Sequence, residues 1–361
     1  MRITRLAEQD FTEVAVINPA HAKALRGHKT DARDCARLAE LFECGLLHGS
    51  YIPPAELKEV RDLTRYRMKT VQARTSEIQR LGKALESAGI KLGSVASSIT
   101  GQSATAMIEA LIGGERRGAV LADLAKGRMR AAGKLADLSM ALAGRFTEHH
   151  ALLCRLHLDR IAVFDDAVDG LDKRIAGKAA RWQREAGLLT SIPGFGDVVA
   201  QAWLGEIGPA PHRHFATCEK LASWVTLCPG NNISARKRKH GRTGDAGTYI
   251  KPMLVQAAWA AIRVRGRLQA RYNRLVRRFG GAKNPAAKKA ITAIAHTLLK
   301  IACQVLKSGV PYTEPGADSC TRRESPGQKQ AWLERQLQKL HPGCTVTITI
   351  SPPEAALPPG A

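Results

Sequence analysis

Apolar residues recur along most of the chain at the three- and four-residue spacing of amphipathic helices. The pattern is most continuous between Pro54 and Arg184. Its clearest run alternates spacings of three and four through Ile161, Phe164, Val168, Leu171 and Ile175. This is the a/d repeat of a coiled-coil seam or a helical hairpin, although over only about two heptads an ordinary bundle core fits nearly as well. The pattern predicts a helical or coiled-coil region over residues 53–185.

The N-terminal residues predict a small piece of α/β structure over residues 1–52. Residues 13–17 form an apolar run typical of a buried strand, and a helix is expected to follow with Thr30 as its N-cap. That helix should end at Gly45 or Gly49. One strand with its neighbouring helices cannot build a sheet-based domain alone. This stretch therefore indicates part of a larger α/β unit, or a unit that a partner completes.

Helical patterns return over residues 186–315 and open with a tight turn at Ser191–Gly196. The turn resembles the hairpin of helix-hairpin-helix DNA-binding elements, in which Gly194 and Gly196 would let backbone N–H groups approach a phosphate. Many helix turns use Pro-Gly without binding DNA, so both interpretations stay open. Further helices are expected over residues 221–227, 248–263, 267–279 and 285–307. Residues 316–361 predict a loosely held tail in which only residues 332–340 form a helix and residues 345–350 a lone strand.

The charge of this mainly α chain indicates what kind of partner it binds. The chain carries 55 Lys and Arg residues against 32 Asp and Glu, a net charge of +23 at pH 7. Residues 231–300 hold 17 of these cations and the single acid Asp245, which leaves +16 in that segment. Such concentration favours a phosphate-binding face over a merely soluble basic surface, and indicates nucleic acid as the partner.

The eight cysteines form no Cys-x-x-Cys pair and no Cys/His spacing typical of a zinc site. Free thiols in a reducing cytoplasm are therefore expected. No apolar run approaches the ~20 residues needed to span a bilayer, and no signal peptide is evident. These features predict a cytoplasmic, nucleoid-associated protein without a membrane partner.

Two acidic residues are candidates for metal binding. Asp31 and Asp34 lie three residues apart at the start of the first expected helix, so their positions share one face. Two such carboxylates can hold Mg²⁺ when other oxygens complete its shell. Asp in a first helical turn also favours the helix dipole, and spacing alone makes this structural interpretation the stronger one.

Ser234 is the candidate nucleophile. It lies in a Gly/Asn loop after Cys228, beside a run of cations at Arg236, Lys237, Arg238, Lys239 and Arg242. A serine that attacks a phosphodiester needs cations to offset the charge of the phosphate. Local sequence alone favours a polar loop serine beside a phosphate-binding strip. Ser191, Ser223 and Ser308 lack this basic context and are expected to be caps or structural residues.

Seven short stretches follow one another along nearly the whole chain. They are Asn18–Lys23, Lys29–Asp34, Leu63–Arg67, Ser191–Gly196, Leu227–Asn231 leading to Ser234, Val255–Trp259 and Lys307–Tyr312. Together they resemble the insertion-sequence one-ten family of transposases, also called bridge-RNA-guided recombinases. The resemblance implies an RNase H-like (RuvC-like) nuclease domain, a coiled-coil middle, and a helical C-terminal transposase domain that carries a nucleophilic serine.

The resemblance also implies a mechanism and partners. The family's Asp-Glu-Asp-Asp set holds Mg²⁺; Asp31 and Asp34 match its last two acids, and Ser234 matches its serine. The metal would activate the scissile phosphate, and the serine would form a covalent phosphoserine before strand exchange. Donor and target DNA, a noncoding guide RNA, and a homodimer or homotetramer are the implied partners.

The chain departs from this pattern at its start. The family's first Asp and its Glu lie upstream of every matching residue, and Glu8, Asp10 and Glu13 do not stand in those contexts. The chain is therefore expected to begin midway through the nuclease fold. The leading hypothesis is a truncated transposase, and its main rival is a non-catalytic nucleic-acid-binding remnant or regulator. A Holliday-junction-type nuclease is a third option, against which the missing carboxylates and the serine loop argue.

Overall fold

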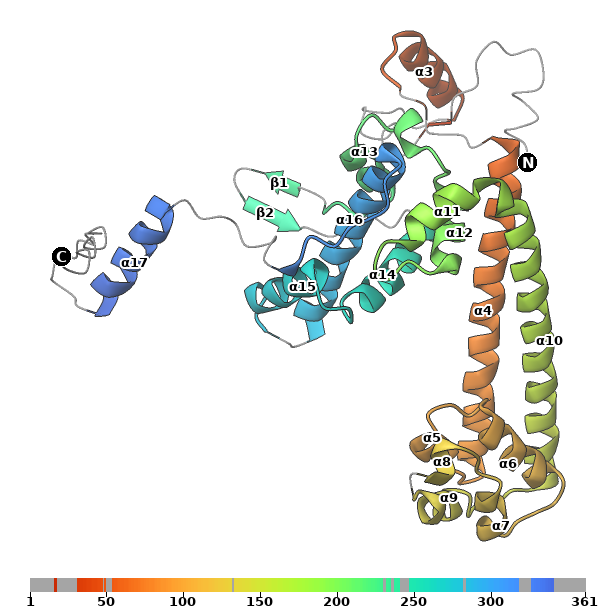
Figure 1. The fold of residues 1–361 in the computed structure, drawn as a ribbon. Coiled ribbons are helices and arrows are strands. Elements are labelled where there is room, and N and C mark those ends of the chain that lie inside the picture. The colour runs from red at the N-terminus through yellow and green to blue at the C-terminus, as the bar shows by residue number, and fades with distance from the viewer. Residues whose placement is uncertain are drawn as a thin grey trace, which may run out of the picture.

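The computed structural model describes residues 16–17, 31–47, 49, 54–131, 133–229, 232–234, 237–240, 247–281, 284–317 and 326–340. Within these residues the chain is mainly helical, as predicted, with one two-stranded sheet (Figure 1). Most of the strand expected over residues 13–17 lies outside the described residues. Helix α3 (Asp31–Glu43) begins directly after Thr30, and Gly45 follows it with a φ of +67°. The predicted start and end of this helix are thus confirmed.

Two long antiparallel helices form the centre of the molecule. Helix α4 (Ala55–Ser87) has 33 residues and α10 (Glu148–Ala179) has 32, so each is roughly 50 Å long. They lie side by side as a helical hairpin (Figure 1). Leu81 of α4 and Ile161 of α10 belong to one cluster of buried side chains, and Ile175 of α10 is buried as well. The predicted run therefore forms the inner face of this hairpin.

Ion pairs outside the apolar seam fix the register of the two helices. Arg67 binds Asp172 in a bidentate pair, and Arg74, seven residues later, binds Asp165 in the same way. Asp165 precedes Asp172 by the same seven residues, as an antiparallel pairing requires. Partly exposed pairs contribute little stability each. Their matched spacing nevertheless disfavours any other register.

A small helical cluster closes the far end of the hairpin (Figure 1). Its helices are α5 (Leu92–Val95), α6 (Gln102–Ile112), α7 (Gly118–Asp123), α8 (Arg128–Ala131) and α9 (Leu135–Ala141). Side chains from these helices and from the hairpin ends share one apolar core, in which Leu81, Met107, Leu121 and Leu138 are fully buried. The segment between the helical arms is therefore a packed unit of its own.

The C-terminal helices pack around a second core at the other end of the hairpin. They are α11 (Gln183–Thr190), α12 (Asp197–Glu206), α13 (Cys218–Trp224), α14 (Ile250–Ala261), α15 (Arg267–Arg278) and α16 (Asn284–Ser308), with short 3-10 helices η1 (Ala180–Trp182) and η2 (Pro211–Arg213). Helix α16 contacts α13, α14 and α15, and its Ile294, Leu298 and Ala302 are fully buried. Four of the helices expected here are confirmed.

Two expectations about apolar and polar runs need correction. In the described part of the chain, the stretch Pro285–Ser308 of α16 is long and apolar enough to cross a bilayer, although no such run was expected. Most of this stretch is buried against the rest of the fold. A helix buried in the core of a protein has the same apolar composition. The tail helix α17 (Pro326–Leu340) is longer than predicted, because its polar first turns carry no apolar pattern.

Candidate functional site

Ser234 lies in a β-hairpin and not in the irregular loop that was expected. Strand β1 (Asn232–Ser234) pairs with the antiparallel strand β2 (Lys237–His240). Ser234 is opposite Lys237 and Ile233 is opposite Arg238. Residues at opposite positions of an antiparallel pair share one face, so backbone pairing places a serine position and a lysine position side by side. Of the other predicted cations, Lys239 lies on β2, while Arg236 and Arg242 fall outside the described residues.

The two ends of this hairpin segment are tied to the end of α13. Leu227, just before the hairpin, is buried in the C-terminal core. After the hairpin, Gly247 has a φ of +79°, and a Cβ added there would lie 2.5 Å from the carbonyl oxygen of Val225. Only glycine permits this approach without a clash. Gly247, which follows the β-hairpin, therefore lies against Val225, which precedes it.

A polar cluster lies beside the start of the serine segment. The Cys228 Sγ is 3.9 Å from Nε2 of His296 on α16. Burial lowers the pKa of His296, and the positive charges of Lys300 and Arg271 lower it further. Burial raises the pKa of the Cys228 thiol, as does the charge of Glu219. At neutral pH the pair is therefore a thiol beside a neutral imidazole.

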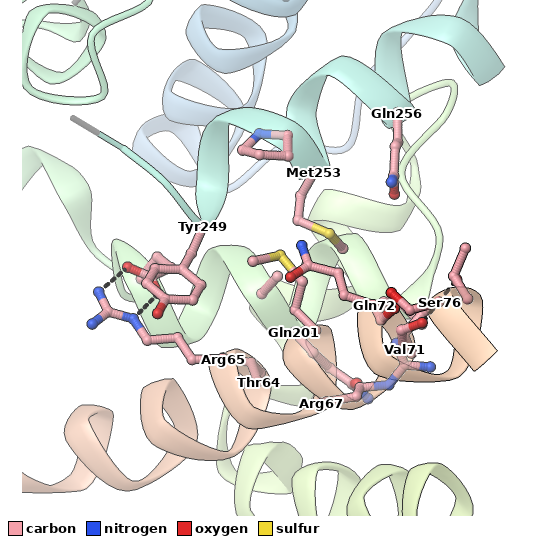
Figure 2. Close-up of a pocket in the computed structure, with 16 residues that line it drawn as sticks. Thr64, Arg65, Arg67, Val71, Gln72, Ser76, Gln201, Tyr249, Met253 and Gln256 are labelled. Carbon is pink, nitrogen blue, oxygen red and sulfur yellow. Dashed lines mark hydrogen bonds and ion pairs between the residues drawn. The ribbon is translucent and has the colours of Figure 1, made fainter. Parts of the chain in front are cut away.

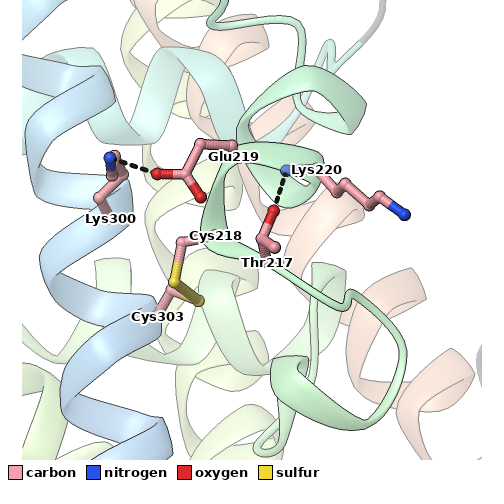
Figure 3. Close-up of a disulfide and its surroundings, with 6 residues drawn as sticks. All are labelled: Thr217, Cys218, Glu219, Lys220, Lys300 and Cys303. Atoms are coloured by element: carbon pink, nitrogen blue, oxygen red, sulfur yellow. Dashed lines mark hydrogen bonds and ion pairs between the residues drawn. A yellow bond between two sulfur atoms is a disulfide. The ribbon is translucent and has the colours of Figure 1, made fainter.

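A disulfide joins α13 to α16 (Figure 3). Cys218 and Cys303 are 85 residues apart, with their Cα atoms 6.0 Å from each other. The expectation of free thiols is therefore wrong for these two cysteines. The Lys300 ammonium also binds the Glu219 carboxylate at 2.5 Å, next to the disulfide. Helix α13, which leads directly to the serine segment, is thus held to the core helix by a covalent bond and an ion pair.

The Pro-Gly turn at Ser191–Gly196 connects α11 to α12, and its two glycines differ. Gly194 has a φ of +86°, and a Cβ there would lie 2.2 Å from the Ala257 carbonyl oxygen. Its close approach is thus to the backbone of α14. Gly196 is the N-cap of α12, with nothing within 4 Å of an added Cβ. Ser191 is structural, as expected, since its Oγ donates to the Leu188 carbonyl and accepts from the Tyr312 N–H at 2.9 Å.

The two candidate metal ligands occupy the first turn of α3. Asp31 is its first residue and Asp34 its fourth, so the backbone places both on one face of the helix. Their side chains lie outside the described residues. Among the side chains that the structure does describe, no group of three or more His, Cys, Asp or Glu residues is arranged to hold a metal ion.

Helix α15 supplies a cationic surface, which was not among the sites predicted from the sequence. It carries five arginines and is anchored by the buried Leu268 and Val276. The structure places a hollow of about 370 Å³ against Arg271, Arg274 and Arg278. Arginine suits phosphate recognition because its planar fork donates two parallel hydrogen bonds. The i, i+3/i+4 spacing of these arginines was the signal that could have indicated one basic helix face.

The motif Leu63–Arg67 lies where the long helix α4 contacts the C-terminal helix α12. Arg65 donates bidentate hydrogen bonds of 2.6 and 2.8 Å to the buried Glu206 carboxylate of α12 (Figure 2). The Arg65 guanidinium also lies 4.4 Å from the ring centroid of Tyr249. Arg61 donates to the carbonyl oxygens of Gly205 and Glu206, the last residues of α12. These contacts hold α12 against α4.

Comparisons with known families match two separate parts of the chain. The model of the transposase IS116/IS110/IS902 family matches residues 186–273, which include Ser234, the β-hairpin and the start of α15. A DEDD transposase model of the IS110 type matches residues 2–90, which include Asp31 and Asp34. DEDD transposase domains typically use divalent metal ions. No curated protein matches the chain.

Proposed function

Because the chain belongs to the IS116/IS110/IS902 family of transposases, which act on DNA, we propose that it cleaves and rejoins DNA strands through Ser234. The observation that carries this proposal is the pairing of Ser234 with Lys237 in a basic two-stranded ribbon. The ribbon segment is rooted in the C-terminal core at Leu227 and Gly247. A fixed point of attachment on each side would help a nucleophile to meet a phosphate in one orientation.

In the proposed step, the Ser234 oxygen forms a bond to the phosphorus of the scissile phosphodiester. The bond from phosphorus to one deoxyribose oxygen breaks, and that oxygen leaves as a hydroxyl group. The proton lost by the serine balances the proton gained by the leaving group. The cation at Lys237, which is paired with Ser234 on the ribbon, offsets the charge of the phosphate during this exchange. The reverse reaction, with a hydroxyl from another strand, joins new partners.

Asp31 and Asp34 are the residues that would hold a divalent metal. Their carboxylate donor set and their i, i+3 placement in the first turn of α3 suit a hard cation, and we propose Mg²⁺. When bound, the ion would supply Lewis-acid polarisation of the scissile phosphate. In this proposal residues 1–52 belong to an RNase H-like unit, residues 53–185 to the hairpin region, residues 186–315 to the transposase domain, and residues 316–361 to the tail.

The proposed partners are donor DNA, target DNA and a guide RNA, in the cytoplasm. Strand exchange involves two duplexes, so a homodimer or homotetramer is part of the proposal. One feature of α10 supports it: Leu152, Leu156 and Val163 are 60%, 50% and 65% exposed. Their spacing of four and seven places them along one side of a helix. A second copy would bury this stripe.

A covalent-adduct assay tests the proposed nucleophile. The full chain is incubated with Mg²⁺, end-labelled DNA from the ends of the element that encodes it, and RNA transcribed from that element. Labelled DNA should migrate with the protein on a denaturing gel, and Ser234→Ala should abolish that band. Ser223→Ala, at an exposed serine of α13, is the matched control and should retain it. An adduct that persists in Ser234→Ala would refute the assignment.

A second arm separates the metal from the serine. Asp31→Ala and Asp34→Ala should each lose the adduct while DNA binding is unchanged. Binding itself should weaken steeply with salt, because many cations meet phosphates. If neither the parent nor any variant forms an adduct while salt-dependent DNA binding persists, the chain is a non-catalytic nucleic-acid-binding protein.

A further inference from the structure

A cleft of about 440 Å³ is lined by side chains of the long helix α4 and of α12 and α14 (Figure 2). The segment of α4 that lines it lies more than 100 residues before the other lining segments in the sequence. The proposed chemistry of Ser234, Asp31 and Asp34 does not use it. Its volume lies within the range of about 300–1,000 Å³ that is typical of small-ligand sites.

Three glutamine side chains approach this cleft from three different helices. Gln72 lies on α4, Gln201 on α12 and Gln256 on α14 (Figure 2). Within the described part of the chain, none of these amides has a hydrogen-bond partner; each therefore offers one acceptor and two donors. Three free amides around one cleft suit a ligand whose edges carry both donors and acceptors.

The other side chains that line the cleft include polarisable and aromatic groups. Met68 and Met253 contribute thioether groups, and Tyr249 contributes an aromatic ring. Methionine sulfur and aromatic rings make favourable contacts with the faces of planar groups. These contacts complement the amides, since a planar heterocycle presents apolar faces and polar edges.

The two arginines that line the cleft are paired with carboxylates, so they do not favour a strongly anionic occupant. Arg65 is neutralised by Glu206, and Arg67 by Asp172. A cation remains at the side of the cleft, where the exposed Lys69 lies 6.0 Å from the Tyr249 ring centroid. A ligand with a neutral planar part inside the cleft and a phosphate outside it fits this distribution.

We propose that this cleft binds one unpaired nucleobase of a nucleic-acid strand. The base would lie against Met68, Met253 and Tyr249, with its edge hydrogen-bonded to Gln72, Gln201 and Gln256. Nucleobases are recognised in single strands by this combination of stacking and edge contacts. The inference extends the proposed function, because it assigns a site for an unpaired base of RNA or DNA. It does not depend on the nucleophile.

Fluorescence binding to short single strands tests the cleft. Matched RNA and DNA oligonucleotides carry either one central 2-aminopurine or an abasic site at that position, with an end-attached dye. The full chain should bind the base-containing strand about tenfold more tightly than the abasic one, and 2-aminopurine emission should change on binding. Preference in the RNA series assigns the cleft to RNA, and preference in the DNA series assigns it to a DNA strand.

Variants of the amides provide the control. Gln201→Ala and Gln256→Ala should each reduce that preference by roughly three- to tenfold. Gln102→Ala, at an exposed glutamine of α6, should leave it unchanged. Equal affinity of the parent for both strands would overturn the proposal, as would an undiminished preference in both cleft variants. Ser234→Ala is included and should bind like the parent, so a failed adduct assay and a failed cleft assay remain distinguishable.

Discussion

Gly194→Ala separates the two interpretations of the Pro-Gly turn. The Cβ introduced by this change would lie 2.2 Å from the Ala257 carbonyl oxygen and 2.8 Å from the Ala261 nitrogen. Both atoms belong to the backbone of α14, so no side-chain rotation relieves the overlap. The native φ of +86° is also disfavoured for any residue that carries a Cβ.

The structure gives the size of the effect. A left-handed backbone costs a residue with a Cβ about 1–2 kcal/mol. Overpacking that forces a backbone to shift costs about 1–3 kcal/mol. Gly194→Ala should therefore lower the free energy of unfolding of the C-terminal core by about 2–5 kcal/mol.

Urea denaturation followed by tryptophan fluorescence measures this loss. Four of the five tryptophans report on the C-terminal helices: Trp182, Trp203, Trp224 and Trp259. Gly196→Ala is the matched control, because Gly196 has a φ of −91° and open space where a side chain would stand. Its loss should not exceed about 1 kcal/mol, the usual scale for a helix N-cap.

One outcome would refute this reasoning. If Gly194→Ala unfolds at the same urea concentration as the parent but binds DNA poorly, Gly194 serves the approach of a phosphate. Loss of stability in Gly194→Ala, together with weaker DNA binding in the stable Gly196→Ala variant, would give the two glycines separate roles.

Two further predictions concern the disulfide and the buried carboxylate of the hairpin. Cys218→Ser opens a loop of 85 residues, so the free energy of unfolding should fall by about 4–5 kcal/mol, and reductant should shift the urea midpoint of the parent but not of this variant. A parent insensitive to reductant would contradict the role of the disulfide. Glu77 is 4% exposed, and although burial raises its pKa, hydrogen bonds and charges from His157 and Arg80 outweigh this and lower it below 4.5. Glu77→Gln should therefore cost about 1–3 kcal/mol at pH 7. The difference in free energy of unfolding between parent and variant, measured by circular dichroism, should have its full size above about pH 4.5. It should shrink as the pH falls through the pKa of Glu77 in the folded protein, because the parent then loses the charge that the variant lacks. A deficit independent of pH, or an equal one in the exposed control Glu109→Gln, would show that the charge is not responsible.

Most helices could be predicted from the sequence because helical periodicity is a local property. The helix after Thr30 and the helices α14 to α16 begin and end within a few residues of the predicted positions, and the predicted run from Ile161 to Ile175 lies within α10. The β-hairpin at Ser234 could not be predicted in this way. Its strands are three and four residues long, and the sequence of β2, Lys-Arg-Lys-His, lacks the apolar alternation that indicates a strand. Pairing with β1 makes it a strand.

In the candidate site, too, local features could be predicted from the sequence and contacts between distant residues could not. Ser234 and Asp31 were found as candidates from the residues beside them and from motif order, which need no tertiary information. The arginines of Leu63–Arg67 were found as a motif, but their partners were not, since Glu206 and Asp172 lie more than 100 residues away. Cys218 and Cys303 gave no signal either, because their spacing matches no known cysteine pattern.

The sequence by itself thus determined the helical class, the concentration of positive charge and the candidate nucleophile. The first two follow from residue types and short spacings, and the third also depends on the order of motifs along the chain. Only the tertiary structure decided that Gly194 packs against α14 and that three glutamines from three helices meet in one cleft. The physical reason is that such contacts depend on how whole helices pack against each other, which no local stretch of the chain encodes.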